Sequence, residues 1–183
     1  FMIKKTRFVP PSGVIPFCSF SFYAAPLGFV CDNLEDAYPL FRAMYCRYFC
    51  RLHSISSKPG SLLSLCALYE TLIIHSVPEV AYHLQKLHVQ PLKIAFPWIV
   101  RAFVTVLPAD QVLLLWDRVI GFDSCELFAI LAAAMVVFRA RILLNASSAE
   151  EIDMIFQDNS GLKVVPLLQH FFFACNETGQ FEV

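Results

Sequence analysis

Cysteine and histidine are the side chains of this sequence most able to do chemistry, because a thiolate or an imidazole can act as nucleophile, base or metal ligand. The seven cysteines are Cys18, Cys31, Cys46, Cys50, Cys66, Cys125 and Cys175. No two of them have the two-residue spacing of structural zinc sites, and Cys46 and Cys50, one helical turn apart, have no companion pair of ligands. We therefore expect free thiols in a reducing compartment and no metal site.

The histidines and glycines also form no catalytic pattern. His75, His83 and His88 have no acid or cysteine at a fixed spacing, so we expect them on helix surfaces or helix ends. The six glycines are dispersed, and none precedes the Lys-Ser or Lys-Thr pair of a phosphate-binding loop. A Gly-x-Ser-x-Gly turn and a His-Glu-x-x-His helix are absent as well. An enzyme with its own nucleophile and base is a weak hypothesis, and we expect no cofactor.

The composition favours a compact protein that acts on another protein. A chain of 183 residues is long enough for one domain with a single core. Hydrophobic residues make up 57% of it, so part of its apolar surface should be covered by a partner protein or a membrane. The net charge of −1 gives no reason to expect nucleic acid, whose phosphates need clustered Lys and Arg.

A membrane anchor is the alternative that the start of the chain raises. Residues 8–31 carry no charge and follow Lys4, Lys5 and Arg7, an outline that a membrane span or a signal peptide would share. The prolines of this run are Pro10, Pro11, Pro16 and Pro26. Each would disturb a regular helix, so we favour a buried, partly irregular segment and expect no integral membrane span.

The stretch from Phe96 to Gly121 predicts two short apolar helices that meet at a tight corner. In the first, Pro97 suits the initial position, where its missing N–H costs nothing. The apolar positions that follow at helical spacing are Trp98, Ile99, Ala102, Phe103 and Val106. Pro108 would end this helix.

In the second helix of this stretch, Asp110 can serve as the N-cap, and Gly121 offers a left-handed exit. Its expected buried stripe is Val112, Leu115, Trp116 and Val119. The indole of Trp116 should fill core volume, whereas the neighbouring carboxylate of Asp117 needs a donor. We expect the whole chain to pack about Trp98 and Trp116.

Further helices are predicted on both sides of this stretch. Asp32 or Asn33 caps one that carries an apolar stripe from Leu34 to Phe49, Ser61 caps one that runs to about His75, and Pro78 opens one that ends near Leu87. Later helices are expected over 127–138, buried on all sides behind a capping box of Asp123 and Glu126, after Ser147 with Glu150, and over 164–174. The sequence predicts an all-α fold of about seven to eight helices.

The order of residues in the central stretch resembles a known family. Trp98, Phe103, Leu107-Pro108, Leu115-Trp116-Asp117 and Gly121 are similar to the most recognisable block of the TBC domain, the all-helical domain of Rab GTPase-activating proteins. Residues 24–27, Ala-Ala-Pro-Leu, resemble the end of the family stretch that begins Tyr-x-Gln-Gly-Met-Asn. The resemblance covers about residues 16–141, the later two thirds of such a domain, so we expect residues 1–183 to be one domain that lacks its front part.

The resemblance implies a GTP-bound Rab protein as partner and two catalytic side chains. In the family, an arginine of an Ile-x-x-Asp-x-x-Arg motif neutralises developing charge, and the glutamine of Tyr-x-Gln orients the attacking water. The arginine motif does not occur here, and alignment without a gap puts Pro16 at the tyrosine and Cys18 at the glutamine. A thiol cannot replace the paired donor and acceptor of a carboxamide.

Three functional hypotheses follow. In the first, the protein regulates GTP hydrolysis by a Rab GTPase in membrane trafficking, with both catalytic side chains missing from this chain. In the second, it is a scaffold that binds a Rab or another trafficking partner without activating GTP hydrolysis. In the third, it is a membrane-anchored helical protein. Under the first two, it is an activator or pseudo-activator rather than an enzyme, and we expect it in the cytoplasm, peripheral on endomembranes.

Overall fold

The computed structural model describes residues 20–53, 56 and 58–174. These residues form nine α-helices, three short 3₁₀ helices and no strand, so the predicted all-α class is confirmed. The α-helices are α1 (Leu34–Arg47), α2 (Leu62–Ser76), α3 (Pro78–Lys86), α4 (Pro91–Val100), α5 (Ala109–Gly121), α6 (Glu126–Phe138), α7 (Ala140–Asn145), α8 (Ala149–Ile155) and α9 (Val164–Ala174). The 3₁₀ helices are η1 (Phe20–Tyr23), η2 (Ala25–Phe29) and η3 (Phe49–His53). The helix that the sequence did not predict is α7, which follows α6 after the single residue Arg139.

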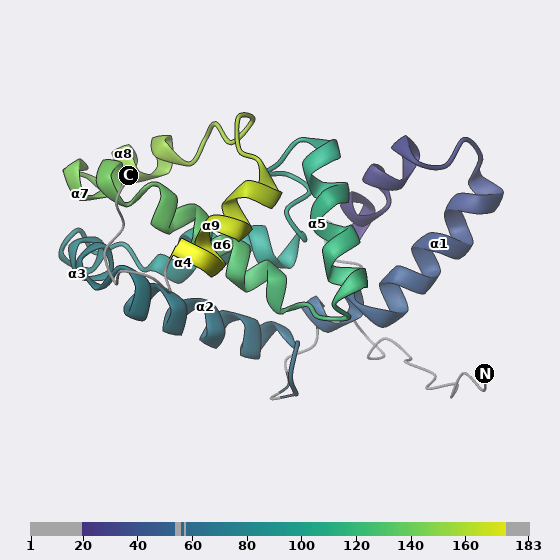
Figure 1. Ribbon diagram of the computed structural model, residues 1–183, viewed down its shortest axis with the longest axis horizontal. Coiled ribbons are helices and arrows are strands. Elements are labelled where there is room, and N and C mark those ends of the chain that lie inside the picture. Colours follow the sequence, from purple (N-terminus) through teal and green to yellow (C-terminus); the bar gives the residue numbers. More distant parts are fainter. Residues whose placement is uncertain (1–19, 54–55, 57, 175–183) are drawn as a thin grey trace.

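Helix α6 is the centre of the fold because it has almost no polar side chain to expose. Phe128, Leu131 and Met135 are fully buried, and the helix packs against α2, α4, α5 and α9. Figure 1 shows α6 in the middle of an elongated molecule, with α2 below it, α1 at one end and α3, α7 and α8 at the other. The predicted buried central helix is therefore confirmed.

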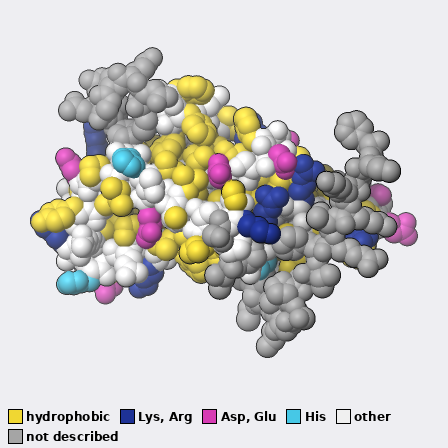
Figure 2. Space-filling view, turned by 90° about the horizontal axis from the view of Figure 1, so that it is seen from below, with side chains coloured by type: hydrophobic (Ala, Val, Ile, Leu, Met, Phe, Trp, Pro, Cys, Tyr) yellow, Lys and Arg dark blue, Asp and Glu magenta, His cyan; other side chains and the backbone are white. Residues whose placement is uncertain are grey.

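Much apolar side-chain area stays exposed, as the composition predicted. Phe122, Phe138 and Phe173 are each more than three-fifths exposed, and Figure 2 shows hydrophobic side chains spread over the face seen from below. None of the helices in the described ranges combines the length and apolar character that a membrane crossing requires. Of the run considered as an anchor, residues 8–19 lie outside the described residues, and the rest form η1, η2 and the turn that follows them.

The corner in the central stretch lies earlier than predicted. Helix α4 begins at Pro91, so Pro97 lies inside it, and it ends at Val100 rather than continuing to Val106. It ends there because Ala102 and Phe103 have left-handed backbones, with φ of 46° and 67°. A right-handed helix cannot continue through such residues. Both side chains are nevertheless fully buried, as their spacing indicated.

The ends of α5 and the start of α6 also differ from prediction. Asp110 is the second residue of α5, and its carboxylate accepts a hydrogen bond from Gln111 Nε2 (2.6 Å) instead of capping the helix. Gly121 is the last helical residue, and Asp123 has the left-handed backbone, with φ of 50°. Asp123 does not take part in a capping box, because its carboxylate binds Arg47; the Oγ of Ser124 accepts from the backbone N–H of Glu126 (3.2 Å).

The caps of the other helices are partly as predicted. Asn33 caps α1 by accepting from the backbone N–H of Asp36 (2.9 Å). Ser61 occupies the N-cap position of α2, but its hydroxyl donates to the Ser56 carbonyl and does not cap. The cap of α8 is one residue later than expected: Ser148 accepts from the N–H of Glu151, whose carboxylate binds Ser147.

Helix α1 is buried at only one end, which contradicts the predicted continuous apolar stripe. At its start, Leu34 is 86% exposed and Tyr38 66% exposed, whereas Met44 and the following Tyr48 and Phe49 are buried. Helix α1 packs on η2 and η3 but extends beyond the bundle (Figure 1), so among the residues that the structure describes its first turns have no α-helix packed closely against them.

Candidate functional site

A buried tyrosine fixes the segment that immediately follows position 18. The ring of Tyr23, fully buried, stacks on Phe49 with centroids 4.6 Å apart, and Phe49 in turn contacts Trp116 at 4.8 Å. The Tyr23 hydroxyl donates to the backbone carbonyl of Val100 at the end of α4 and lies 3.0 Å from Nε2 of His53. Three elements that are distant in sequence, η1, η3 and α4, are thereby joined at one phenol.

The protonation of His53 follows from this geometry. Tyr23 has one hydroxyl hydrogen, which it gives to the Val100 carbonyl, so its oxygen accepts and His53 Nε2 carries the donated hydrogen. Burial lowers the pKa of His53 to about 4 and raises the pKa of Tyr23 well above its usual range. Both groups are neutral at pH 7 and serve as structural donors and acceptors. The pair is separated by thirty residues, and no sequence spacing could have indicated it.

The two tryptophans are in the core, as predicted. Trp98 is 7% exposed and meets Phe156 edge to face, with ring centroids 5.1 Å apart. Trp116 is 2% exposed, and its Nε1–H donates to the carbonyl of Ala102 (3.1 Å), one of the left-handed residues of the corner. The indole of Trp116 therefore holds the α4–α5 corner in place.

Asp117 lies on the surface beside this buried block. Its side chain is 79% exposed, and its carboxylate finds the donor that we expected in the neighbouring guanidinium of Arg118, at 3.2 Å. Such an exposed pair contributes little to stability because water and salt screen it. Asp117 is available to solvent, whereas the tryptophans before it are not.

An open groove separates η2 from the first turns of α1. It has a volume of about 480 Å³, and its lining includes Leu27, Leu34, Tyr38 and Phe41. At its inner end the ring of Phe41 meets the ring of Phe20, with centroids 5.6 Å apart. Phe20 is the first residue of η1, so the start of the described chain lies beside this groove. Cys18 itself lies outside the described residues.

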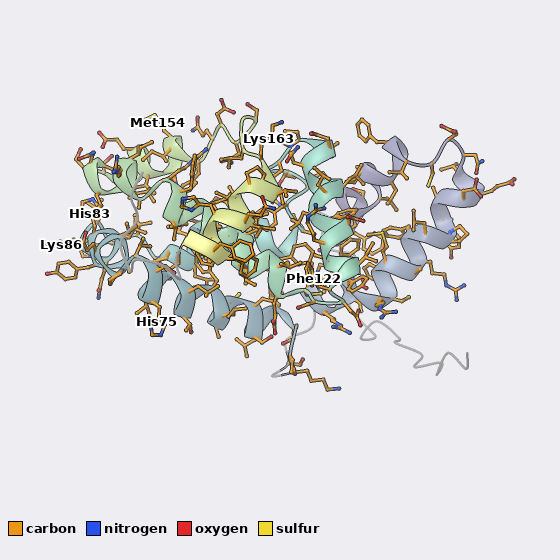
Figure 3. The ribbon with its side chains drawn as sticks, viewed as in Figure 1. His75, His83, Lys86, Phe122, Met154 and Lys163 are labelled. Atoms are coloured by element: carbon orange, nitrogen blue, oxygen red, sulfur yellow. The ribbon has the colours of Figure 1, made fainter. Side chains whose placement is uncertain are left out.

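The remaining candidate side chains have structural surroundings. His83 Nε2 lies 2.8 Å from the Ala146 carbonyl, and Figure 3 shows His75 on the outer side of α2, pointing away from the bundle. The described cysteines have no disulfide partner, and burial raises the pKa of Cys125 to about 11, which makes it a poor nucleophile. Within the part of the chain that the structure describes, no group of His, Cys, Asp and Glu side chains could hold a metal ion.

Comparison with known proteins identifies the family that this chain resembles. The family model of the Rab-GTPase-TBC domain matches residues 18–143. The chain is 51% identical over 167 residues to the human protein TBC1 domain family member 19, an alignment that covers 91% of this chain and 32% of that protein. It is 26% identical over 111 residues to the TBC domain-containing protein kinase-like protein of Dictyostelium discoideum, which covers 61% of this chain and 11% of that protein.

No solved structure matches the chain. The chain spans about a third of the length of the human relative and about a tenth of the length of the other. The family match begins at Cys18, covers more than half of the chain and includes the buried Trp98 and Trp116, the α4–α5 corner and all of α6. With an all-helical structure built around that block, the chain belongs to the Rab-GTPase-TBC domain family.

Proposed function

We propose that this chain is the part of a TBC domain that binds a GTP-loaded small GTPase of the Rab family, within a protein that regulates GTP hydrolysis in membrane trafficking. The domain would continue upstream of Phe1, and the protein would work in the cytoplasm, peripherally on endomembranes. The observation that carries the proposal is the match of the family model over residues 18–143. The anchoring of η1 at Tyr23 supports it, because a segment that must meet a partner at a defined distance needs a rigid base.

We further propose that the chain by itself does not accelerate hydrolysis. Transfer of the γ-phosphoryl group to water needs a positive group at the developing charge and a group that orients the water, together contributing a factor of roughly 10³ to 10⁵. Alignment without a gap puts Cys18 at the water-orienting glutamine of the family, and a thiol lacks a carboxamide's strong donor and acceptor.

Three arginines of the described chain support this view because they already have structural partners. Arg47 makes two hydrogen bonds of 2.9 Å to the Asp123 carboxylate, and Arg118 binds Asp117 and the Leu114 carbonyl. Arg139 donates to the carbonyls of Ile155 and Asp158. Each would have to break these contacts to reach a nucleotide.

The second candidate function is a scaffold that binds a Rab, or another trafficking partner, without activating it. The residue at position 18 is the observation that favours it. Single-turnover GTP hydrolysis by a panel of Rab proteins separates the two functions. It is measured with this chain and with a version extended upstream of Phe1 by its natural sequence. We expect GTP-dependent binding and no stimulation by the chain; stimulation by the chain would contradict our view of position 18.

A substitution at position 18 tests the missing glutamine directly. In the extended version, Cys18→Gln should raise the hydrolysis rate at least tenfold, because a carboxamide can both donate to and accept from the attacking water. The matched control is Cys46→Gln, which changes an exposed cysteine of α1 and should leave the rate unchanged. Equal hydrolysis rates with the unsubstituted extended version, Cys18→Gln and Cys46→Gln would show that position 18 is not the water-orienting position.

A further inference from the structure

The start of α1 and the end of η2 present large apolar side chains that the fold leaves uncovered. Phe29 is 76% exposed, Val30 58%, Leu34 86% and Tyr38 66%. Leu34 and Tyr38, one turn apart on the same face of α1, both line the groove between η2 and α1. Apolar side chains gathered beside a groove mark a surface that a partner, or another part of the protein, covers. We call this surface the η2–α1 groove.

The charges around the η2–α1 groove decide what kind of molecule fits. At the outer end, Asp32 lines the groove, and Glu35 and Asp36 follow it as exposed acidic side chains. The nearest basic residue of α1, Arg42, follows Phe41 at the inner end. The outer rim is therefore acidic. An anionic membrane would be repelled by this rim. A second copy of the chain, meeting the groove across a two-fold axis, would bring like charges together. The complementary occupant is a protein that offers an apolar side chain flanked by lysine or arginine.

The position of the groove links it to the partner of the proposed function. Its inner end, Phe41, contacts Phe20, two residues after Cys18, and its outer end at Leu34 lies seven helical residues away, about 10 Å along α1. A stable interface covers about 800 Å² of each partner, a patch of about 16 Å radius. A GTPase that contacts Phe20 in η1 therefore also covers the groove.

We propose that the η2–α1 groove is a docking site for the GTP-bound Rab partner, which places an apolar side chain with basic neighbours into it. The inference rests on the proposed function and adds the location and chemistry of the contact. Tyr38 and Leu34 supply the apolar contact, and Asp32, which lines the groove, supplies the charge that the basic neighbours meet.

The test measures binding of the full chain to Rab proteins loaded with a non-hydrolysable GTP analogue, and uses pairs of matched variants. Tyr38→Ser should weaken binding about tenfold or more, because truncating an aromatic anchor removes a large share of the binding energy. Tyr82→Ser is its control: Tyr82 is 61% exposed and lines the second groove, between α2 and α3, and its loss should change affinity less than twofold. Leu34→Ser provides a second apolar variant should Tyr38→Ser not fold.

A charge reversal gives an independent readout. Asp32→Lys, at the outer rim of the groove, should slow association, and the effect should shrink as salt is raised. Glu79→Lys reverses an acidic charge in the first turn of α3 and should leave association unchanged. A merely structural role for the groove would alter thermal unfolding but would give no salt-dependent association rate.

The outcomes are distinguishable. Binding by the wild-type chain that survives Tyr38→Ser, Leu34→Ser and Asp32→Lys overturns the docking site and leaves the proposed function standing. Failure of the wild-type chain to bind any Rab of the panel overturns the proposed function and, with it, the docking site. Self-association by sedimentation, or binding to phosphatidylserine vesicles, that is lost in Tyr38→Ser while Rab binding is retained identifies another occupant and also overturns the inference. Rab binding by the version extended upstream that no longer depends on Tyr38 assigns the groove to the upstream part of the domain and overturns the inference as well.

Discussion

His53 should make the stability of this domain depend on pH. Its imidazole has a pKa of about 4 in the folded protein because burial disfavours the charged form, against 6.5 when it is free in water. Between those values the unfolded chain holds more protons than the folded one. The contribution of His53 to the free energy of unfolding is therefore fully present above about pH 6.5 and is lost progressively as the pH falls toward 4.

The size of the effect follows from the two pKa values. A histidine whose pKa is 6.5 in the unfolded chain and about 4 in the folded protein would lower the free energy of unfolding by about 2 kcal/mol between pH 7.5 and pH 5. The imidazole is only partly buried, so solvent screening lowers the expected loss to about 1 kcal/mol. For a domain of this length that corresponds to a fall of about 2–4 °C in the unfolding midpoint.

The variant His53→Gln isolates this contribution. A glutamine amide can still donate to the Tyr23 oxygen but does not titrate. Urea unfolding of both proteins at pH 7.5 and pH 5 should show the wild type losing about 1 kcal/mol more than the variant. The carboxylates are common to both proteins and cancel, including Asp123, whose pKa is lowered chiefly by its hydrogen bond with Arg47. An equal loss in the two proteins, or a wild type that gains stability at pH 5, would refute a neutral, buried His53.

Two further predictions concern buried hydrogen bonds. Gln111, 4% exposed, accepts from the backbone N–H of Val164 at the start of α9. Gln111→Met leaves this buried N–H without an acceptor and should cost about 2 kcal/mol by urea unfolding; a cost below about 0.5 kcal/mol would contradict the capping role. Trp116→Phe removes the donor to the Ala102 carbonyl and leaves a cavity. It should lower the free energy of unfolding by about 2–4 kcal/mol, measured by thermal unfolding. A loss below about 1 kcal/mol would show that the corner does not depend on this indole.

The sequence predicted the helices whose signals are local. Asn33 at the start of α1, Pro78 at the start of α3 and the uncharged run of α6 act through the backbone nearby or through full burial, and each was placed correctly. The corner after α4 was misplaced because Ala102 and Phe103 adopt left-handed backbones that neither residue type favours. The burial of both residues and the hydrogen bond from the Trp116 indole to the Ala102 carbonyl stabilise that conformation.

Contacts of the candidate site between residues far apart in the sequence could not be predicted, for a related reason. The Tyr23–His53 contact and the Arg47–Asp123 pair join residues thirty and seventy-six positions apart, and no spacing rule indicates such partners. Helix α1 was predicted to bury an apolar stripe along its whole length. Periodicity identifies an apolar face but not whether anything lies opposite it, and here the first turns extend past the bundle.

The burial of the tryptophan block has a consequence for how family members should be compared. Trp98, Phe103 and Trp116 touch other core side chains, so these aromatic residues of the block that marks the family cannot touch a GTPase. They serve the fold, which every member of the family can share whatever its partner. Discrimination among Rab proteins must then be encoded elsewhere, in solvent-facing positions that can vary without disturbing the fold.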